Sequence, residues 1–394
     1  MQLSNEWLDN RSYTCLPTQF GPLGPEVLLP AGVTDMREAF RQARMVKTGA
    51  LVQENGDVLF RMIARGAKSV HVIIKPEQLR VDLSDQGDGV WEGVFPFRFA
   101  GPKATDWFVD DVYVLHPYAP IYYSYSHPVN FVDIPDPEMD YVLVRGVPHG
   151  TVCHEYYFSK ATGNTESCLV YTPPGYEQGG EYPILYLQHG AGEGETSWIW
   201  NGKANFILDN LLAAGKCKPF IVVMNNGMVR GKSDGGPMTM KFDTFTQMLL
   251  EDCLPFIEGK YRVIGDKWHR AMAGLSMGSM QTSIIGMTHP ELFGYLGLFS
   301  GFMRALGGDE SFEAQPHLKC LLDLEKFQAD YQLFFRGMGE DDQFRSTFDQ
   351  DDAFCARLGA DPAHLPNHVR KLYPGVHDWN VWRRCLHDFA QMIF

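Results

Sequence analysis

Residues 269–293 read HRAMAGLSMGSMQTSIIGMTHPELF, and this stretch decides the fold. At its centre, Gly274-Leu275-Ser276-Met277-Gly278 matches the pattern G-x-S-x-G. The residues at 269–273 suit a short strand, and those at 277–287 suit a helix that ends before His289-Pro290. A strand, a sharp turn and a helix around a serine predict a nucleophile elbow, which raises the hydroxyl above the edge of a sheet.

The two glycines of this pattern have a steric role in the hypothesis. The serine would sit in a strained turn, and glycine at 274 and 278 leaves room for the backbones that cross there. The turn would also aim the Met277 amide at the oxygen of a reacting carbonyl, as one donor of an oxyanion hole. Taken alone, the pentapeptide also fits an ordinary turn in which Ser276 only caps the helix. The partners of the serine decide between these interpretations.

A candidate base for the serine lies near the end of the chain. Residues 371–389 read KLYPGVHDWNVWRRCLHDF, so His377 follows a Pro-Gly turn and precedes an amphipathic helix. A loop histidine at the end of a strand can reach Ser276, take the hydroxyl proton and return it to the leaving alcohol. A surface position without a role in chemistry is the plainer alternative. His387, inside the helix, is the weaker candidate for the base.

The acid that orients the base is expected between the serine and the histidine. Triads on this kind of sheet follow the chain order Ser, then Asp or Glu, then His. Residues 331–344, YQLFFRGMGEDDQF, supply an apolar strand, glycines and then three carboxylates. We predict Asp342 as the acid, with Asp341 as the second choice, and Glu340 also qualifies by position. The acid would hold the imidazole in one tautomer and stabilise its protonated form.

A second oxyanion donor is expected from the loop after an early strand. Residues 187–198, LQHGAGEGETSW, form that loop. We assign the donor to the amide of Ala191, with Gly190 as its neighbour. His189, in the same loop, is predicted to have a structural role rather than a catalytic one.

The first 140 residues are predicted to form a separate β-rich domain. The run 58–75, VLFRMIARGAKSVHVIIK, alternates apolar and other residues around a turn at Gly66, which predicts two strands. Helical periodicity is weak outside 35–45, so a small β-sandwich is expected. The Pro- and Tyr-rich segment 116–141 is interpreted as an extended connector. Its tyrosines would either seal the domain interface or offer a platform for sugars: Tyr118, Tyr122, Tyr123 and Tyr125.

Residues 141–394 have the texture of an α/β domain. Short apolar runs that suit buried strands alternate with stretches of helical spacing, and no internal repeat is present. Such alternation predicts a mostly parallel sheet covered by helices on both faces, here an α/β-hydrolase fold. The segments that carry this pattern are 165–178, 182–190, 205–216, 218–227 and 243–261.

Composition narrows the classes of function. The 394 residues are 45% hydrophobic and 21% charged, which is typical of a soluble globular protein with two domains. A formal net charge of −14 without any basic block argues against binding to nucleic acid. No run approaches the roughly 18 apolar residues of a membrane span. The stretch 1–15 lacks the apolar core of a signal peptide, so a cytoplasmic location is expected, although a chain that had lost its leader would read the same.

Cofactor and metal signals are weak throughout the sequence. The cysteines have no metal-ligand spacing and are expected to be free thiols in a reducing compartment. The GAGEGE run at 190–195 lacks the register and the acidic partner of a dinucleotide site. We therefore expect no cofactor and no metal. The eight cysteines are Cys15, Cys153, Cys168, Cys217, Cys253, Cys320, Cys355 and Cys385.

From about residue 145 onward, the chain resembles the esterase D-like hydrolases, which include carbohydrate esterase family one and the enterochelin esterases. The resemblance implies Ser276, His377 and Asp342 as a triad, and Met277 and Ala191 as oxyanion donors. It also makes Trp198 and Trp379, within two of the matching motifs, candidates for contact with substrate. The motifs are VYTPPGY, YLQHGAGEGETSW, LLAAGK, VVMNNG, AGLSMGS, GEDDQF and PGVHDWNVW.

The resemblance implies an ester hydrolase that needs no cofactor and acts on a small-molecule ester. A feruloyl esterase that releases hydroxycinnamic acids from sugar esters is the leading expectation, and an acetyl-xylan or enterochelin-type esterase is the alternative. A carbohydrate-binding protein with an inactive hydrolase domain is the alternative from another class. The N-terminal region is similar to the immunoglobulin-like domain of such esterases, and it also resembles the carbohydrate-binding modules of family forty-eight. Its Trp91 and Trp107, with the tyrosines at 118–125, would then line an aromatic pocket or belong to the core.

Overall fold

The computed structural model describes residues 26–30, 32–96, 100–229, 242–304, 312 and 314–394. The chain divides into two compact units, Met1–Val144 and Arg145–Phe394, whereas the sequence predicted a boundary at 140. Cys15 and the stretch 1–15 lie outside the described residues, and the seven described cysteines are free thiols. No helix in the described part of the chain combines the length and apolar character needed to cross a membrane.

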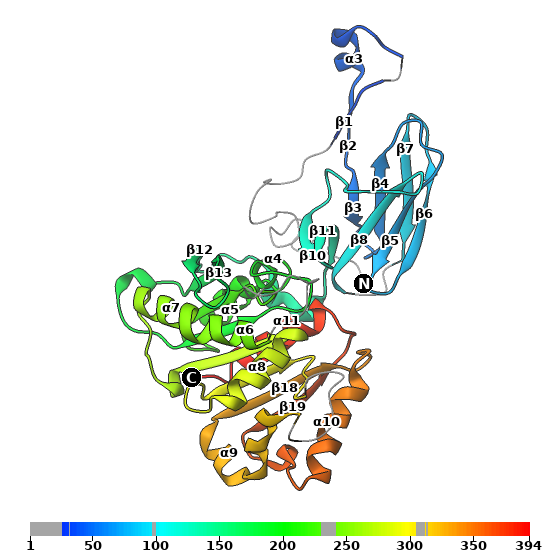
Figure 1. Ribbon diagram of the computed structural model, residues 1–394. Helices are drawn as coiled ribbons and strands as arrows, with labels where there is room; N and C mark the ends of the chain where they lie inside the picture. Colours follow the sequence, from blue (N-terminus) through cyan, green and yellow to red (C-terminus); the bar gives the residue numbers. More distant parts are fainter. Residues whose placement is uncertain (1–25, 31, 97–99, 230–241, 305–311, 313) are drawn as a thin grey trace. The chain divides into compact units, whose positions relative to one another are not determined.

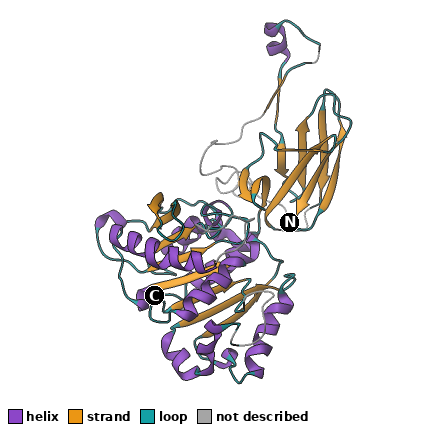
Figure 2. Cartoon of the chain, viewed as in Figure 1, coloured by secondary structure: helices purple, strands orange, loops and turns teal. Residues whose placement is uncertain are grey.

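Within the described residues of the N-terminal unit, nearly all regular elements are antiparallel strands (Figures 1 and 2). One short helix, α3 (Met36–Gln42), lies between the paired strands β1 (Glu26–Leu28) and β2 (Arg44–Val46). A 3-10 turn, η1 (Pro137–Val142), ends the unit. The other strands are β3 (Gly49–Val52), β4 (Val58–Ile63), β5 (Val70–Lys75), β6 (Leu79–Asp85), β7 (Val90–Phe95), β8 (Gly101–Val109), β9 (Val112–Val114), β10 (Ile121–Ser124) and β11 (His127–Ile134).

Strand β6 folds this sheet over on itself. The strands pair in the order β10-β11-β8-β5-β6-β7-β4-β3, with β9 beside β8. Strand β6 pairs with β5 along most of its length and with β7 at Ser84 and Asp85. Phe60 in β4 meets Trp107 in β8 edge-on at 5.6 Å between ring centroids, although three strands separate them in the path. Two layers therefore enclose one apolar core, as in a β-sandwich.

The prediction of an extended connector at 116–141 is wrong, because β10 and β11 form a hairpin that joins the sheet through β8. Its two-residue turn is Tyr125-Ser126, with φ of 52° and 64°. Positive φ at both positions is the geometry usually supplied by Asn-Gly, so the sequence carried no recognisable hairpin signal. Pro128 pairs only with Tyr123 of β10, and β11 meets β8 from Asn130 onward, so the missing proline N–H interrupts no central ladder.

The aromatic residues of this unit mainly build its own core. Trp91 and Trp107 are buried among the apolar side chains between the two layers, so the core interpretation holds for both. Within the hairpin, Tyr122 packs edge-on against Phe131 at 4.9 Å between ring centroids. Tyr123, on the opposite face of the same strand, is exposed.

The C-terminal unit is built on an eight-stranded mixed sheet in the order β12-β13-β15-β14-β16-β17-β18-β19. Strands β12 and β13 are antiparallel, and from β15 to β19 every pair is parallel. This is the α/β-hydrolase architecture that the alternating pattern predicted. The strands are β12 (Thr151–Phe158), β13 (Thr165–Thr172), β14 (Ile184–Gln188), β15 (Ile221–Asn225), β16 (Arg270–Leu275), β17 (Tyr295–Phe299), β18 (Leu333–Gly339) and β19 (His368–Tyr373).

Helices connect these strands, and several short 3-10 turns lie between them. The α-helices are α4 (Ser197–Trp200), α5 (Ala204–Ala213), α6 (Phe242–Gln247), α7 (Leu254–Lys260), α8 (Met277–Thr288), α9 (Leu324–Asp330), α10 (Arg345–Arg357) and α11 (Trp379–Ala390). The 3-10 turns are η2 (Tyr176–Gln178), η4 (Lys267–His269), η5 (Pro316–Leu322) and η6 (Pro362–His364). Between α6 and α7 the backbone forms a π-helix, η3 (Met248–Cys253), where the sequence predicted one regular helix. Pro255 explains the interruption, because its nitrogen cannot donate to a carbonyl in the preceding turn.

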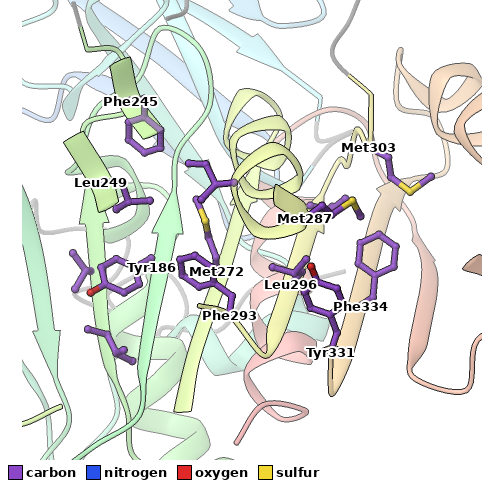
Figure 3. Packing of buried hydrophobic residues seen from close by; sticks show 14 of the residues in the cluster. Tyr186, Phe245, Leu249, Met272, Met287, Phe293, Leu296, Met303, Tyr331 and Phe334 are labelled. Atoms are coloured by element: carbon purple, nitrogen blue, oxygen red, sulfur yellow. The ribbon is translucent and has the colours of Figure 1, made fainter. Parts of the chain in front are cut away.

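Both faces of this sheet are buried by helices. Tyr186, Met272, Leu296 and Phe334 come from successive parallel strands and share one cluster with side chains of the helical layer (Figure 3). Phe335, the next residue along β18, points the other way and meets Phe389 of α11 at 5.8 Å between ring centroids. Burial on both faces explains why these strands are continuous apolar runs in the sequence. The carboxyl ends of the parallel strands are left to carry the polar loops of the site.

Candidate active site

Ser276 occupies the turn between strand β16 and helix α8, as the sequence predicted. Its backbone has φ 50° and ψ −113°, a strained conformation for a residue with a side chain. A Cβ on Gly274 would lie 2.4 Å from the Gly278 carbonyl oxygen, and one on Gly278 would lie 2.7 Å from the His189 carbonyl oxygen. Backbone crowds both positions, so only glycine fits, and the turn raises the serine side chain to the edge of the sheet.

Two backbone amides at this elbow differ in availability. The Ser276 N–H donates to the Phe299 carbonyl at 3.0 Å. Met277 is the first residue of α8, so its N–H has no acceptor within the helix. The helix dipole adds positive potential at this end. The Met277 amide is therefore available to an oxygen atom from outside the helix, and its role as an oxyanion donor stays a prediction.

His377 reaches Ser276 from the loop between β19 and α11. Its Nε2 lies 3.0 Å from Ser276 Oγ, and its Nδ1 lies 2.8 Å from Asp342 Oδ2. Because a carboxylate can only accept, Nδ1 carries the proton and Nε2 accepts from the serine hydroxyl. Phe344 and Trp382 meet the imidazole edge-on at 4.9 and 5.2 Å between ring centroids. Two aromatic rings and two polar contacts thus hold the imidazole in one orientation.

Asp342 is the carboxylate that the structure places against His377. It is buried and also accepts from the Ser300 hydroxyl and the Phe344 amide, each at 2.8 Å. Asp341 and Glu340 are exposed. The Glu340 amide donates to the carbonyl of Tyr373 at the end of β19, and the Asp341 amide donates to that of Gly375 in the loop after it. These bonds set the register of the loop, so only the third carboxylate turns inward.

The loop after β14 is held by the side chain of His189. The Gly227 N–H donates to His189 Nε2 at 2.8 Å, so Nδ1 carries the proton and donates to the Gly190 carbonyl at 2.7 Å. Burial lowers the pKa of His189, which keeps the ring neutral. A trans peptide points its N–H opposite its carbonyl, so this bond also sets the direction of the Ala191 N–H. The geometry agrees with the structural role predicted for His189.

Gly190 and Ala191 differ in what their amides can do. The Gly190 N–H donates to Glu193 Oε2 at 3.2 Å. Ala191 is exposed at the tip of the loop. Of the two neighbours named from the sequence, Ala191 is therefore the one suited to an outside oxygen atom.

Comparison with known protein families shows which family has this arrangement of motifs. A family model described as "Putative esterase" matches residues 159–392, more than half of the chain. The chain belongs to this esterase family. The matched range contains the elbow, the histidine, the acid and the loop after β14.

Proteins with related sequences and folds agree with the family match. The esterase chain is 37% identical over 355 residues to an endo-1,4-beta-xylanase/feruloyl esterase of Xylanibacter ruminicola. The alignment covers 87% of this chain and 46% of the relative, so the chain spans less than half of that relative's length. A carbohydrate esterase family one ferulic acid esterase from Anaeromyces mucronatus, solved with ferulic acid, has TM-score 0.54 and 23% identity over 64% of this chain and 93% of its own.

A further solved structure is similar along most of the esterase chain. The enterobactin esterase of Shigella flexneri has TM-score 0.59 and 14% identity, over 85% of this chain and 92% of its own. At this level of identity the likeness is one of fold.

The structure corrects the prediction that Trp198 and Trp379 contact substrate. Both side chains are buried in the esterase and meet each other edge-on at 5.1 Å between ring centroids. The Trp198 indole N–H donates to the Gln188 carbonyl at 2.9 Å, and that of Trp379 donates to Glu193 Oε1 at 3.1 Å. A tryptophan near a site motif is as easily a support beneath the loops as a surface for ligand, and here both are supports.

The sequence did not predict that Ser300 forms a hydrogen bond with the acid Asp342. Ser300 directly follows β17 with φ 46°, and its hydroxyl donates to Asp342 while accepting from the Trp382 indole at 2.9 Å. The available signal was a serine followed by glycine at the end of a parallel strand, where sites of this fold gather. His387 bonds to its neighbour Asp388 at 3.0 Å and is not part of the group around Ser276.

Proposed function

We propose that this protein is a serine carboxylic ester hydrolase that forms an acyl-enzyme at Ser276. The observation that carries the proposal is the unbroken chain of contacts from Ser276 Oγ through the imidazole of His377 to the carboxylate of Asp342. Serine, base and acid meet at the carboxyl ends of three different parallel strands, where this fold places its chemistry. Membership of an esterase family supports the same reaction class.

Each residue has one task in the proposed mechanism. His377 Nε2 accepts the hydroxyl proton as Ser276 Oγ bonds to the ester carbonyl carbon. The amides of Met277 and Ala191 stabilise the oxyanion that forms. The protonated His377 then gives its proton to the leaving alcohol, and the acyl group remains on the serine. Water, activated by the same histidine, releases the acid and restores the serine. Asp342 stays ionised and stabilises the charged imidazole.

Feruloyl or related hydroxycinnamoyl esters of sugars are the proposed substrates. The xylanase/feruloyl esterase similar to 87% of this chain supports this choice. A second support is the apolar cluster of Met277, Met280 and Phe302, against which Met228, Phe242 and Phe344 pack while only partly buried. Phe344 also contacts the imidazole of His377. An apolar, sulfur- and ring-lined surface beside the base suits a planar aromatic acyl group better than a small acetyl group.

The reaction class is tested by removing the nucleophile. Ser276→Ala should lower kcat on methyl ferulate by about a thousandfold or more and abolish labelling by a fluorophosphonate probe. The matched control is Ser346→Ala, an exposed serine at the start of α10, which should behave as the unchanged protein. Labelling that survives in Ser276→Ala would overturn the proposal. A wild-type chain that takes no label and turns over no ester would favour an inactive carbohydrate-binding protein instead.

Substrate class is tested by a panel of esters with the unchanged protein. The largest kcat/KM is expected on methyl ferulate or a feruloylated oligosaccharide. Acetylated xylo-oligosaccharide and a catecholate trilactone represent the alternatives suggested by the family and by the enterobactin esterase fold. A higher kcat/KM on either of these would replace the feruloyl assignment and leave the reaction class intact.

A further inference from the structure

Glu193 is a buried carboxylate beside the site that the proposed mechanism does not use. Its side chain accepts two hydrogen bonds, from the Gly190 N–H at Oε2 and from the Trp379 indole N–H at Oε1. The first donor belongs to the loop after β14, and the second belongs to the first residue of α11. The carboxylate therefore joins the loop after β14 to the start of α11, two segments that lie far apart in the sequence.

Both joined segments carry groups that the proposed reaction needs. Gly190 directly precedes Ala191, the proposed second oxyanion donor, and Trp379 comes two residues after the base His377. A methyl group built on Gly190 would lie 3.6 Å from both Glu193 Oε2 and the Cβ of Ser276. The Gly190 backbone therefore lies close to both the carboxylate of Glu193 and the nucleophile.

We propose that Glu193 is a positioning residue, which holds the loop of the second oxyanion donor against the loop of the base through its two hydrogen bonds. The inference rests on the proposed ester hydrolysis. One oxygen fixes the Gly190 peptide, and His189 fixes the next peptide through the Gly190 carbonyl. Together the two side chains leave the Ala191 amide little freedom, which is the preorganisation that an oxyanion hole requires.

The charge of Glu193 matters because two N–H groups point at it. Burial raises the pKa of Glu193 to about 7, against the lowering effect of the Gly190 amide and the Trp379 indole. A carboxylate can accept fully at both oxygens, whereas a protonated carboxyl group gives up acceptor capacity at one. The clamp is therefore complete when Glu193 is ionised.

The titratable side chains on the segments that pack around Glu193 are bonded mainly to groups other than Glu193. His189 is bonded to Gly190 and Gly227, and His377 is paired with Asp342. On α11, Asp378 caps the helix through the Asn380 N–H, and Arg383 donates to the Asn201 carbonyl. In the loop itself, Glu195 accepts from the Ser167 hydroxyl.

The test compares kcat of Glu193→Gln with that of the unchanged protein between pH 6 and pH 8. Glutamine has one acceptor oxygen, so it keeps one bond and turns its NH₂ group toward the other donor. At pH 8 kcat should fall about tenfold, and the ratio of the two kcat values should shrink toward pH 6, where the unchanged Glu193 is protonated. Because both proteins contain His377, its own titration cancels in this ratio. KM should change little.

A second variant tests whether the two hydrogen bonds act as one clamp. Trp379→Phe removes the indole donor and keeps an aromatic ring. In Glu193→Gln/Trp379→Phe, the glutamine oxygen can serve Gly190 while its NH₂ group faces no donor. The double variant should therefore recover several-fold in kcat over Glu193→Gln at pH 8. The matched control is Glu195→Gln in the same loop, which should stay within about twofold at every pH.

The outcomes separate this inference from the proposed function. Fluorophosphonate labelling of Ser276 in every variant shows that the nucleophile and the fold are intact. If the unchanged protein is labelled and hydrolyses ester, but the kcat ratio is constant with pH and the double variant adds the two single effects, the positioning role is overturned. If Ser276 in the unchanged protein takes no label, the proposed hydrolysis itself fails.

Discussion

The nucleophile elbow and the loop after β14 face each other across the site, yet different physical forces shape them. The elbow is shaped by backbone sterics within five consecutive residues, because a Cβ at Gly274 or Gly278 would collide with main-chain atoms. The loop is shaped by side chains whose partners are far away in the chain: His189 binds Gly227, and Glu193 binds Trp379. A local steric requirement can be read from one stretch of sequence, whereas the partners in a network of distant hydrogen bonds cannot.

The largest effect is expected at the acid, which shows how strongly the elbow depends on one distant side chain. Asp342→Asn should lower kcat by about 10³- to 10⁴-fold, because an amide no longer stabilises the protonated imidazole or fixes its tautomer. The neighbouring Asp341→Asn, at an exposed carboxylate, should stay within about twofold. Steady-state kinetics on methyl ferulate measures both. Equal losses in the two variants would mean that the register of the loop differs from the one described.

A smaller loss is expected from the loop after β14, where the amide of Ala191 is the proposed oxyanion donor. Ala191→Pro removes the N–H and should lower kcat by about 10²- to 10³-fold, the usual cost of one oxyanion donor. Ala191→Gly keeps the N–H and should lose far less. Circular dichroism and labelling of Ser276 show whether the proline variant is folded. If Ala191→Pro were folded and fully active, a group other than the Ala191 amide would have to be the second oxyanion donor.

The loop should also make stability depend on pH, whereas the elbow should not. Glu193 has a pKa of about 7 in the folded chain, above its ordinary value of 4.5. The folded state therefore binds the proton more tightly, and this stabilisation is complete below about pH 4.5 and lost as the pH rises through about 7. Between pH 5 and pH 8 the free energy of unfolding of the unchanged protein should fall, relative to that of Glu193→Gln, by up to about 3 kcal/mol. Thermal unfolding of both proteins at the two pH values measures this as a drop in Tm for the unchanged protein alone. If the free energy of unfolding changed with pH in the same way in both proteins, the raised pKa of Glu193 in the folded chain would be contradicted.

The smallest effect is expected at Trp198, which lies beneath the loop. Trp198→Phe loses the bond to the Gln188 carbonyl and should destabilise the fold by about 1 kcal/mol. KM for methyl ferulate should remain within about twofold, because the side chain is buried. A large rise in KM with unchanged Tm would restore the original interpretation of this tryptophan as a substrate contact.

The same contrast explains where the sequence misled. The hairpin of β10 and β11 was missed because its turn contains Tyr125 and Ser126, whereas turns with positive φ at both positions usually contain Asn and Gly. Ser300 was missed because its two partners, Trp382 and Asp342, lie far from it in the chain. Trp379 was given the wrong role because burial depends on what packs over a side chain, and a motif does not record that.

By itself, the sequence determined the α/β architecture of the C-terminal unit, the elbow at Ser276 and the choice of His377 as the histidine that contacts the serine. Neighbouring residues in the chain set the periodicity, the order of strands and helices, and the need for glycine in a tight turn. The sequence alone therefore reveals these features. Only the tertiary structure decided that Asp342 rather than Asp341 faces His377. It also decided that the Gly190 amide is bonded to Glu193 while Ala191 is exposed, and that Glu193 joins the loop after β14 to the start of α11. These outcomes depend on how loops from different strands meet, because a carboxylate or an amide acquires its role only from the atoms that surround it.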